Sequence, residues 1–465
     1  MTSLSESLLL SKFIKTNKIT TFSGLKDELE KIKDDEKCYS LDVKEDENVG
    51  LIYHNGEKHD TTEEIIALED STKSCIIDKK TLEPIVTQYN NIIYNDDATK
   101  YLNDKLWSDV VVYKCYEGTF IIVYNHEGKW YVSTRRCLNA KESIWVQNTS
   151  YLELFNDVIE EKFKIEDLDP NYCYHFILVH FANQNIIIRD PETREIILTM
   201  VTPKYSCQQL TMDEINLNPK LKLVFDKTIQ PEIYHFSCLD EVIDYLNRTS
   251  EKDEIHKRVT SEGVIIKHYL GEIGKSVFVL LKLQTEIYQK LTKIKPNNNN
   301  VHQIYLELYQ KDLLKEYLPY YTVDSSEIIR RINIAFKTLS HEILFLYFET
   351  RKKKNQLIYD KLPGIYRKVL FEIHGIFIKK KKEMDVSTEI DGTQSITIHD
   401  VYYYLKGLEP NTLRRIFYNR MMMIKNQINT GCFEESNKFI TMQTYLMFQT
   451  TKDKDCDIDK YKDTN

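Results

Sequence analysis

Short runs of apolar residues, many of them β-branched or aromatic, recur through the first 295 residues of the chain. Turn residues such as the NHEG of 125–128 separate them. This pattern is typical of strands in an antiparallel sheet, and here it predicts a sheet that encloses a cleft. The predicted strands lie at 109–116, 119–124, 129–135, 174–181, 185–190 and 195–201.

The region before residue 96 mixes helical and strand-like patterns. Residues 25–36 (LKDELEKIKDDE) predict a helix, and the Asn55-Gly56 pair within 49–59 is a signal for a hairpin turn. We therefore expect a small α+β lobe over 1–95, followed by a sheet-rich core over 96–295.

The pattern changes after residues 293–300 (KIKPNNNN), because proline and an asparagine run support neither a helix nor a strand ladder. Apolar residues then recur near helical spacing, which predicts an all-helical domain over 301–450. The tail 451–465 has no apolar face and is predicted to be disordered. The predicted fold class is thus α+β, with an antiparallel sheet domain followed by a helical C-terminal domain. The clearest helical segments are 301–318, 327–349 and 413–428.

Composition narrows the class of protein. The chain has 465 residues, of which 42% are hydrophobic, and is longer than one hydrophobic core usually serves. More than one domain is therefore expected. Its nine cysteines never fall in C-x-x-C spacing, which favours a reducing compartment over a disulfide framework or a structural zinc site. No apolar run approaches the roughly 20 residues of a membrane span. We expect an intracellular, cytoplasmic protein without membrane contact, the virion being the alternative location if the protein is viral.

Charge is distributed unevenly along the chain. The net charge is −8, from 63 Lys and Arg against 71 Asp and Glu, so a nucleic-acid surface must be local. Residues 351–382 carry eleven Lys or Arg against two acidic residues, with tyrosines interleaved. This segment could contact RNA phosphates. The alternative is a solvated helix face.

Several short motifs could carry phosphate chemistry. KCYEGT (114–119) places a lysine and a carboxylate beside a Gly-Thr turn, and SEGVIIK (261–267) places Glu262 before a glycine. Lys282 interrupts the apolar run VFVLL, where a lysine without an anionic partner would be costly. Arg135 and Arg136 end an alternating strand, so only one of them can face a cleft. Further upstream, Lys73-Ser74 opens another predicted strand.

In this order the motifs resemble those of ATP-dependent RNA ligases of the bacteriophage 5′-to-3′ type and related ligase-like proteins of large DNA viruses, which are covalent nucleotidyltransferases. The resemblance covers roughly residues 60–295. It implies a lysine that attacks ATP, transfer of AMP to an RNA 5′-phosphate, and sealing of RNA ends. It also implies Mg²⁺, which neutralises triphosphate charge.

The resemblance assigns roles to individual residues. The catalytic residues are Lys114 as nucleophile, Glu262 and Lys282. Glu117 and Glu262 are the expected metal ligands, and Asn183 matches a motif asparagine. The residues expected to bind the nucleotide are Lys73, Glu117, Gly118, Arg135, Arg136 and Lys267.

The sequence departs from the family pattern at the position of the nucleophile. The family's lysine stands three residues before the glycine, where this chain has Cys115, and Lys114 stands one residue earlier. A β-bulge between Tyr113 and Glu117 would turn Lys114 into the cleft, whereas a regular strand would place Cys115 there.

Further departures leave the activity open. The family's second motif lysine is replaced by Gln284, and Ile177 and Phe181 stand where the family has a glutamate and a proline. Two other functions therefore stay open: a non-catalytic RNA- or nucleotide-binding protein on the same fold, and a structural virion protein.

Overall fold

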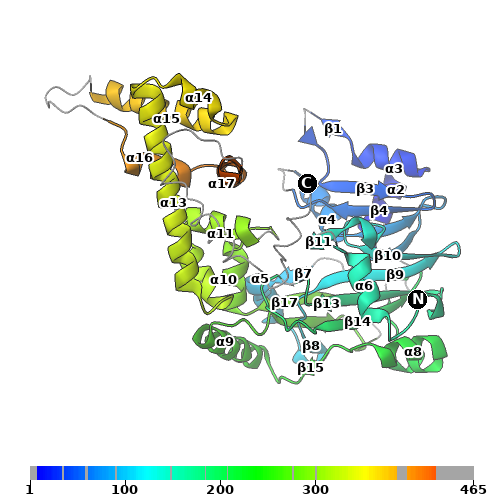
Figure 1. Ribbon diagram of the computed structural model, residues 1–465. Coiled ribbons are helices and arrows are strands. Elements are labelled where there is room, and N and C mark those ends of the chain that lie inside the picture. Colours follow the sequence, from blue (N-terminus) through cyan, green and yellow to red (C-terminus); the bar gives the residue numbers. More distant parts are fainter. Residues whose placement is uncertain are drawn as a thin grey trace. The chain divides into compact units, whose positions relative to one another are not determined.

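The computed structural model describes residues 8–33, 36–57, 61–88, 92–146, 149–183, 185–206, 208–274, 277–298, 301–384 and 395–425. The chain divides into two compact units between residues 290 and 291, within α10 (Glu286–Ile294). The first unit contains sheets and helices, and the second is helical (Figure 1). The predicted α+β fold class is confirmed. The predicted disordered tail, 451–465, lies outside the described residues.

The first sheet of the sheet unit is antiparallel, with strand order β3-β4-β5-β6. Three helices contribute to the core on one of its faces, through residues such as Leu10, Leu25 and Leu68. A two-residue strand pair, β1 (Ile32–Lys33) with β2 (Glu36–Lys37), precedes the sheet. The strands are β3 (Leu41–Glu45), β4 (Val49–His54), β5 (Cys75–Asp78) and β6 (Pro84–Thr87), and the helices are α2 (Leu9–Thr16), α3 (Phe22–Leu29) and α4 (Glu63–Ser71).

Two local predictions in this region were wrong. The helix predicted over 25–36 ends at Leu29, since the next apolar residue, Ile32, is exposed rather than packed on the core. The Asn55-Gly56 pair does not join two strands. Strand β4 is already paired on both sides, with β3 and β5, and the next element along the chain is α4, capped by Thr62.

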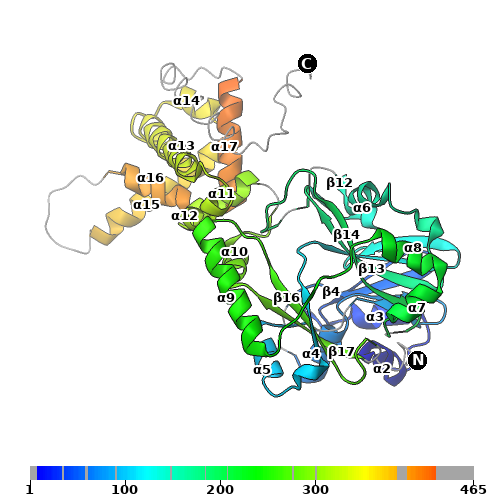
Figure 2. The same ribbon diagram turned by 90° about the horizontal axis from the view of Figure 1, so that it is seen from below.

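The second sheet is also antiparallel and has the order β10-β9-β13-β14. The turn predicted at 125–128 joins β9 to β10, with positive φ at Glu127 and Gly128. Helices α6, α7 and α8 share one hydrophobic core with this sheet (Figure 2). The strands are β9 (Thr119–His126), β10 (Lys129–Thr134), β13 (Tyr172–His180) and β14 (Arg194–Pro203), and the helices are α6 (Tyr151–Ile159), α7 (Met212–Leu217) and α8 (Pro219–Lys227). The short pair β11 (Ile144–Val146) and β12 (Thr149–Ser150) lies before α6.

The third sheet has the order β15-β8-β16-β17-β7, with β7 parallel to β17. Helices α5 and α9 share a hydrophobic core with one of its faces (Figure 2). Strand pairing places Tyr113, Ile265 and Lys282 side by side, so these residues and Lys267 share the opposite face. The strands are β7 (Ile92–Tyr94), β8 (Val110–Lys114), β15 (Ile233–Tyr234), β16 (Gly263–Tyr269) and β17 (Phe278–Gln284), and the helices are α5 (Asn95–Leu102) and α9 (Leu239–His256).

The second unit is built around α13, whose buried stripe includes Ile332, Phe336 and Ile343. A fully buried ion pair joins Glu342 of α13 to Arg420 of α17, with 2.7 Å between Nε and Oε2. No helix among the described residues is long and apolar enough to cross a membrane. The helices are α11 (Val301–Gln310), α12 (Leu314–Tyr317), α13 (Ser325–Tyr347) with its π-helical extension η5 (Phe348–Lys352), α14 (Gln356–Lys361), α15 (Gly364–Met384), α16 (Ile398–Lys406) and α17 (Pro410–Lys425).

Candidate functional site

The KCYEGT motif lies where the chain passes from one sheet to the next. Strand β8 ends at Lys114 in the third sheet, and β9 begins at Thr119 in the second. Lys114 pairs with Val264, and the backbone N–H of Cys115 donates to the carbonyl of Gly263 at 3.2 Å. This pairing is regular and has no register shift, so Lys114 and Cys115 point to opposite faces of the sheet.

Lys114 points toward a surface carboxylate. Its Nζ lies 3.5 Å from Oε2 of Glu232, with both side chains about half exposed, and 5.2 Å from the ring centre of Tyr116. The role of Lys114 as nucleophile stays a prediction. The arrangement follows the regular-strand alternative, in which the residue beside Glu262 is Cys115.

Cys115 is buried, and its thiol interacts with both Glu262 and Lys282. Burial raises the pKa of this thiol well above its usual value, an effect that Lys282 opposes and Glu262 reinforces. The group is therefore a neutral thiol. It has neither the amine needed for a phosphoramidate nor the negative charge of a reactive thiolate.

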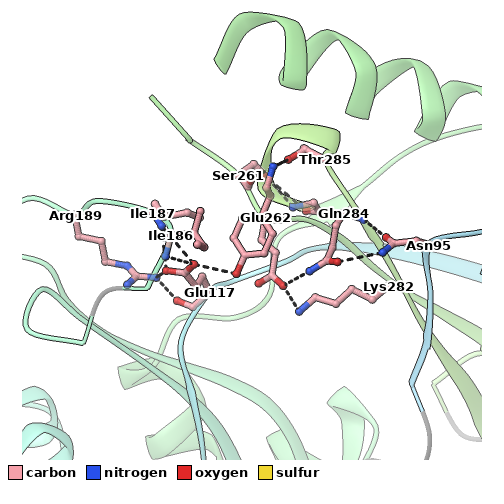
Figure 3. A network of polar contacts seen from close by, with 12 residues as sticks. Asn95, Glu117, Ile186, Ile187, Arg189, Ser261, Glu262, Lys282, Gln284 and Thr285 are labelled. Atoms are coloured by element: carbon pink, nitrogen blue, oxygen red, sulfur yellow. Dashed lines mark hydrogen bonds and ion pairs between the residues drawn. The ribbon is translucent and has the colours of Figure 1, made fainter. Parts of the chain in front are cut away.

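Glu262 and Lys282 form a nearly buried ion pair (Figure 3). Gln284 Nε2 donates to Oε1 of Glu262 at 3.0 Å, and Asn95 in turn holds Gln284 through two hydrogen bonds. Burial opposes the charge on Lys282, but the carboxylate of Glu262, which attracts the ammonium and accepts its hydrogen bond, outweighs that effect and raises its pKa. Lys282 is thus held as an ammonium ion, which suits phosphate binding and not nucleophilic attack.

The glycine that follows Glu262, Gly263, is required for steric reasons. Its φ is +143°, and an added Cβ would lie 2.0 Å from the carbonyl oxygen of Leu283. Only glycine allows β16 to approach β17 this closely while Glu262 lies against Lys282. Gly118 is constrained similarly, since its Cβ would come within 2.6 Å of Ile177 and of the Leu178 carbonyl.

Glu117 acts as an anchor for the segment 185–187. Three successive backbone N–H groups, of residues 185, 186 and 187, donate to its carboxylate at 2.9 to 3.3 Å. Tyr288 donates its hydroxyl at 2.9 Å, and Arg189 lies 3.6 Å away and also donates to the Glu117 carbonyl (Figure 3). These contacts use the acceptor positions that a carboxylate offers. The strand predicted at 185–190 was wrong, because these N–H groups bond Glu117 instead of a neighbouring strand.

Three of the basic residues assigned to the nucleotide lie around His54. Lys73 and Arg135 both act electrostatically on His54, and Lys73 is also paired with Asp70 at 2.6 Å. Arg136 instead donates to the carbonyl of Asn55 at 2.8 Å.

Tyr94, at the end of β7, lies beside the ion pair, because strand pairing sets it opposite Lys282 of β17. Its side chain is about half exposed. The structure thus brings Tyr94, Lys282, Glu262 and Cys115 together in one cluster.

Lys267 lies apart from that cluster. It is buried, donates to Oε1 of Gln209 at 2.9 Å, and has its Nζ 4.5 Å from the ring centre of Phe278. It also acts electrostatically on His175 of the second sheet. Burial lowers the pKa of Lys267 to about 8.

The predicted metal ligands, Glu117 and Glu262, do not fit a protein-held Mg²⁺. Mg²⁺ needs oxygen ligands with free lone pairs in octahedral geometry. The carboxylate of Glu117 already accepts hydrogen bonds from four donors, and Glu262 is bound to Lys282 and Gln284. Within the described part of the chain no group of three or more His, Cys, Asp or Glu side chains is placed to hold a metal ion.

Sequence reasoning missed three polar residues that organise the site. Arg189 and Tyr288 bind Glu117, and Asn95 holds Gln284. Nothing in the sequence pattern marks Tyr288 as a site residue, since it lies in the apolar stripe of α10. Arg189 had one: it directly follows three isoleucines, where an arginine without a partner would be costly.

Comparisons with known proteins found a curated relative and several similar solved structures. No protein-family model matches the chain. A curated relative, the Immediate-early protein ICP-46 homolog of Invertebrate iridescent virus 3, is 21% identical over 357 residues, which is 69% of each chain.

Solved structures similar to this chain include ATP-dependent RNA ligases. An archaeal ATP-dependent RNA ligase matches 63% of this chain and 67% of its own, with a TM-score of 0.36 and 12% identity. A mutant RNA ligase of Naegleria gruberi, solved with ATP and manganese, matches 46% of this chain and 64% of its own, with a TM-score of 0.30 and 14% identity. Similarity at this level assigns no activity, and we therefore argue function from the residues of the site.

Proposed function

We propose that this chain is a ligase-like protein that binds a nucleotide, with ATP as the expected ligand, without forming a lysine adenylate. One observation carries the proposal. The residue three positions before Gly118 is a buried cysteine that lies against Glu262 and Lys282, while Lys114 leaves the opposite face of the same strand toward Glu232.

The chemistry of these groups is suited to binding a phosphate and not to transferring AMP. Nucleophilic attack on the α-phosphate needs a neutral amine at the reacting position. The Cys115 thiol cannot supply it, and Lys282 is held as an ammonium ion by Glu262. The charge that would bind a phosphate is thus retained, whereas the nucleophile is absent from that position.

The surroundings of Tyr94 support nucleotide binding. An exposed aromatic ring offers a surface for a base, and Lys282, its neighbour across the strand pair, offers charge for phosphates. Glu117 would serve this site indirectly, by fixing the turn between Cys115 and Gly118. Mg²⁺ would arrive with the phosphates of the nucleotide, since the protein's own carboxylates are engaged.

Covalent catalysis is the alternative function. In that case β8 would have to bulge so that Lys114 leaves Glu232 and reaches the face of Cys115. Its neutral amine would attack the α-phosphate of ATP and release pyrophosphate. The AMP would then pass to an RNA 5′-phosphate and leave when the 3′-hydroxyl seals the ends. The 3.5 Å ion pair with a half-exposed partner does not prevent this movement, because surface ion pairs stabilise by only about 0–1 kcal/mol.

The test uses ATP labelled on its α-phosphate, with Mg²⁺, followed by denaturing electrophoresis and peptide mapping. We expect no covalent adenylate on the natural chain or on Lys114→Ala, together with thermal stabilisation of both by ATP. Lys282→Gln should lose most of that stabilisation. Cys115→Lys, which places an amine beside Glu262 and Lys282, should form an adenylate if it folds.

Two outcomes would contradict the proposal. An adenylate mapped to Lys114, and abolished by Lys114→Ala, would establish covalent catalysis. An unchanged melting temperature at millimolar ATP, in the natural chain and in Lys114→Ala alike, would remove nucleotide binding and favour the structural role.

A further inference from the structure

The basic residues of segment 351–382 in the helical unit fall into two groups: those engaged in contacts within the unit, and those exposed on α15. Several are engaged within the unit: Lys353 is paired with Glu349 at 2.5 Å, and Arg367 donates to the carbonyls of Leu362 and Asp360. The Arg351 guanidinium lies 6.0 Å from the ring centre of Tyr359. Lys380 is paired with Asp400 of α16. All four are thus engaged within the unit, and the charges of Lys353 and Lys380 are balanced by carboxylates.

All the remaining exposed residues of α15 except Lys381 form one continuous face. Apart from the adjacent Ile378 and Lys379, successive members are three or four positions apart, which places them on the same side of a helix. This face, which we call the α15 stripe, is roughly 27 Å long at 1.5 Å per residue. Its members, all exposed, are Gly364, Lys368, Phe371, Gly375, Ile378, Lys379 and Lys382.

The α15 stripe combines positive charge with one exposed aromatic ring. Phe371 is 67% exposed, and the Lys368 side chain is 71% exposed with its nearest carboxylate, Glu372, at 3.8 Å. Lys379 and Lys382 have no ion-pair partner among the described residues. The stripe itself contains no acidic residue, so its charge is complementary to an anionic partner.

Single-stranded RNA fits this combination better than other anions. Lysines contact backbone phosphates, and an exposed aromatic ring stacks on an unpaired base, which a duplex keeps inside its stack. A lipid surface would require a wide apolar face, whereas the stripe offers only Phe371 and Ile378.

We propose that the α15 stripe binds single-stranded RNA, with Lys368, Lys379 and Lys382 contacting phosphates and Phe371 stacking on a base. This inference rests on the proposed function only in taking RNA as the polymer that a ligase-like protein would meet. It requires neither nucleotide binding nor adenylate formation in the sheet unit.

The experiment measures binding of the full chain to a fluorescein-labelled, unstructured RNA oligonucleotide by anisotropy over a range of salt concentrations. The variant Lys368→Ala/Lys379→Ala/Lys382→Ala should weaken binding at least tenfold. It should also reduce the slope of log K against log salt by about 2, because each phosphate contact on a single strand contributes about 0.7. Phe371→Ala should weaken binding roughly tenfold without changing the slope, as expected for a lost stacking partner.

Matched controls show whether a loss of affinity comes from the α15 stripe or from any equal loss of charge or apolar surface. Lys311→Ala/Lys315→Ala/Lys337→Ala removes the same charge from exposed positions on other helices or turns of the unit, and Leu357→Ala removes an exposed apolar side chain from α14. Both should bind RNA like the natural chain. Stabilisation of every variant by ATP should be unchanged, so a failure here is distinguishable from a failure of the proposed function.

Three results would overturn the inference. The first is an absence of RNA binding by the natural chain. The second is equal loss of affinity in the α15 variant and in its charge-matched control. The third is binding to vesicles of anionic lipid, but not to RNA, that depends on Phe371, which would reassign the stripe to a membrane surface.

Discussion

At the scale of single side chains, Lys267 combines a charge with nearly complete burial. Its Nζ has a hydrogen bond to the neutral amide of Gln209 and aromatic rings as further neighbours. Burial without a counter-charge disfavours the ammonium form, which is why the pKa falls to about 8. At neutral pH the side chain is still charged, so it lowers the stability of the fold.

We predict that Lys267→Met raises the free energy of unfolding by about 3 kcal/mol at pH 7. The folded pKa, about 8, lies below the unfolded value, so the cost is complete below pH 8 and is relieved as pH rises toward about 10.5. The gain should therefore shrink at pH 10. Urea unfolding at both pH values measures it, with the exposed Lys220→Met as control. A loss of stability at both pH values would show that Lys267 makes favourable contacts instead.

The sequence predicted some site residues well and others not at all. Lys282 was identified because a charge that interrupts an apolar run requires a partner, and Glu262 because it precedes a glycine in a Glu-Gly pair. The two are paired with each other. The direction of Lys114 could not be predicted, since it depends on whether β8 is bulged. Tyr288 could not be found either, because its distance in sequence from Glu117 gives no indication of contact.

At the scale of elements, strands with strong apolar patterns were predicted correctly, and those whose N–H groups find another acceptor were not. Strands β9, β10, β13 and β14 lie where the apolar runs predicted them. Residues 185–187 are as apolar as a strand but donate to Glu117. Pattern alone does not show where a backbone donor finds its acceptor.

The junction of α15 and α16 gives a prediction at this scale. Lys380 is paired with Asp400, a partly buried residue that also caps α16 through Thr397. Lys380→Glu should therefore lower the free energy of unfolding by about 1–2 kcal/mol, because it replaces attraction by repulsion at a helix terminus. Lys381→Glu, one position along on the exposed side, should change it by less than about 0.5 kcal/mol. Thermal unfolding of the two variants compares them, and equal effects would contradict the pairing.

At the scale of the whole molecule, the chain forms two compact units with separate cores. Each contains a buried charged pair that ties distant segments together. Glu117 joins Arg189, residues 185–187 and Tyr288 in the sheet unit, and Glu342 joins Arg420 in the helical unit.

We predict two unfolding transitions in urea, each shifted by variants in only one unit. Glu117→Gln and Arg420→Met should each lower the stability of their own unit by about 3 kcal/mol, since removing one partner leaves a buried group uncompensated. All three tryptophans, Trp107, Trp130 and Trp145, lie in the first unit, so fluorescence reports its transition, while far-UV circular dichroism reports both. A single transition, shifted by both variants, would show that the units unfold together.

The position of Cys115 also has a genetic consequence. Cysteine and lysine codons differ at every position of the triplet, so no single nucleotide substitution can place an amine beside Glu262 and Lys282. A population carrying this gene has no one-step route to a lysine there. Selection therefore acts on the function that the site performs with a cysteine at position 115.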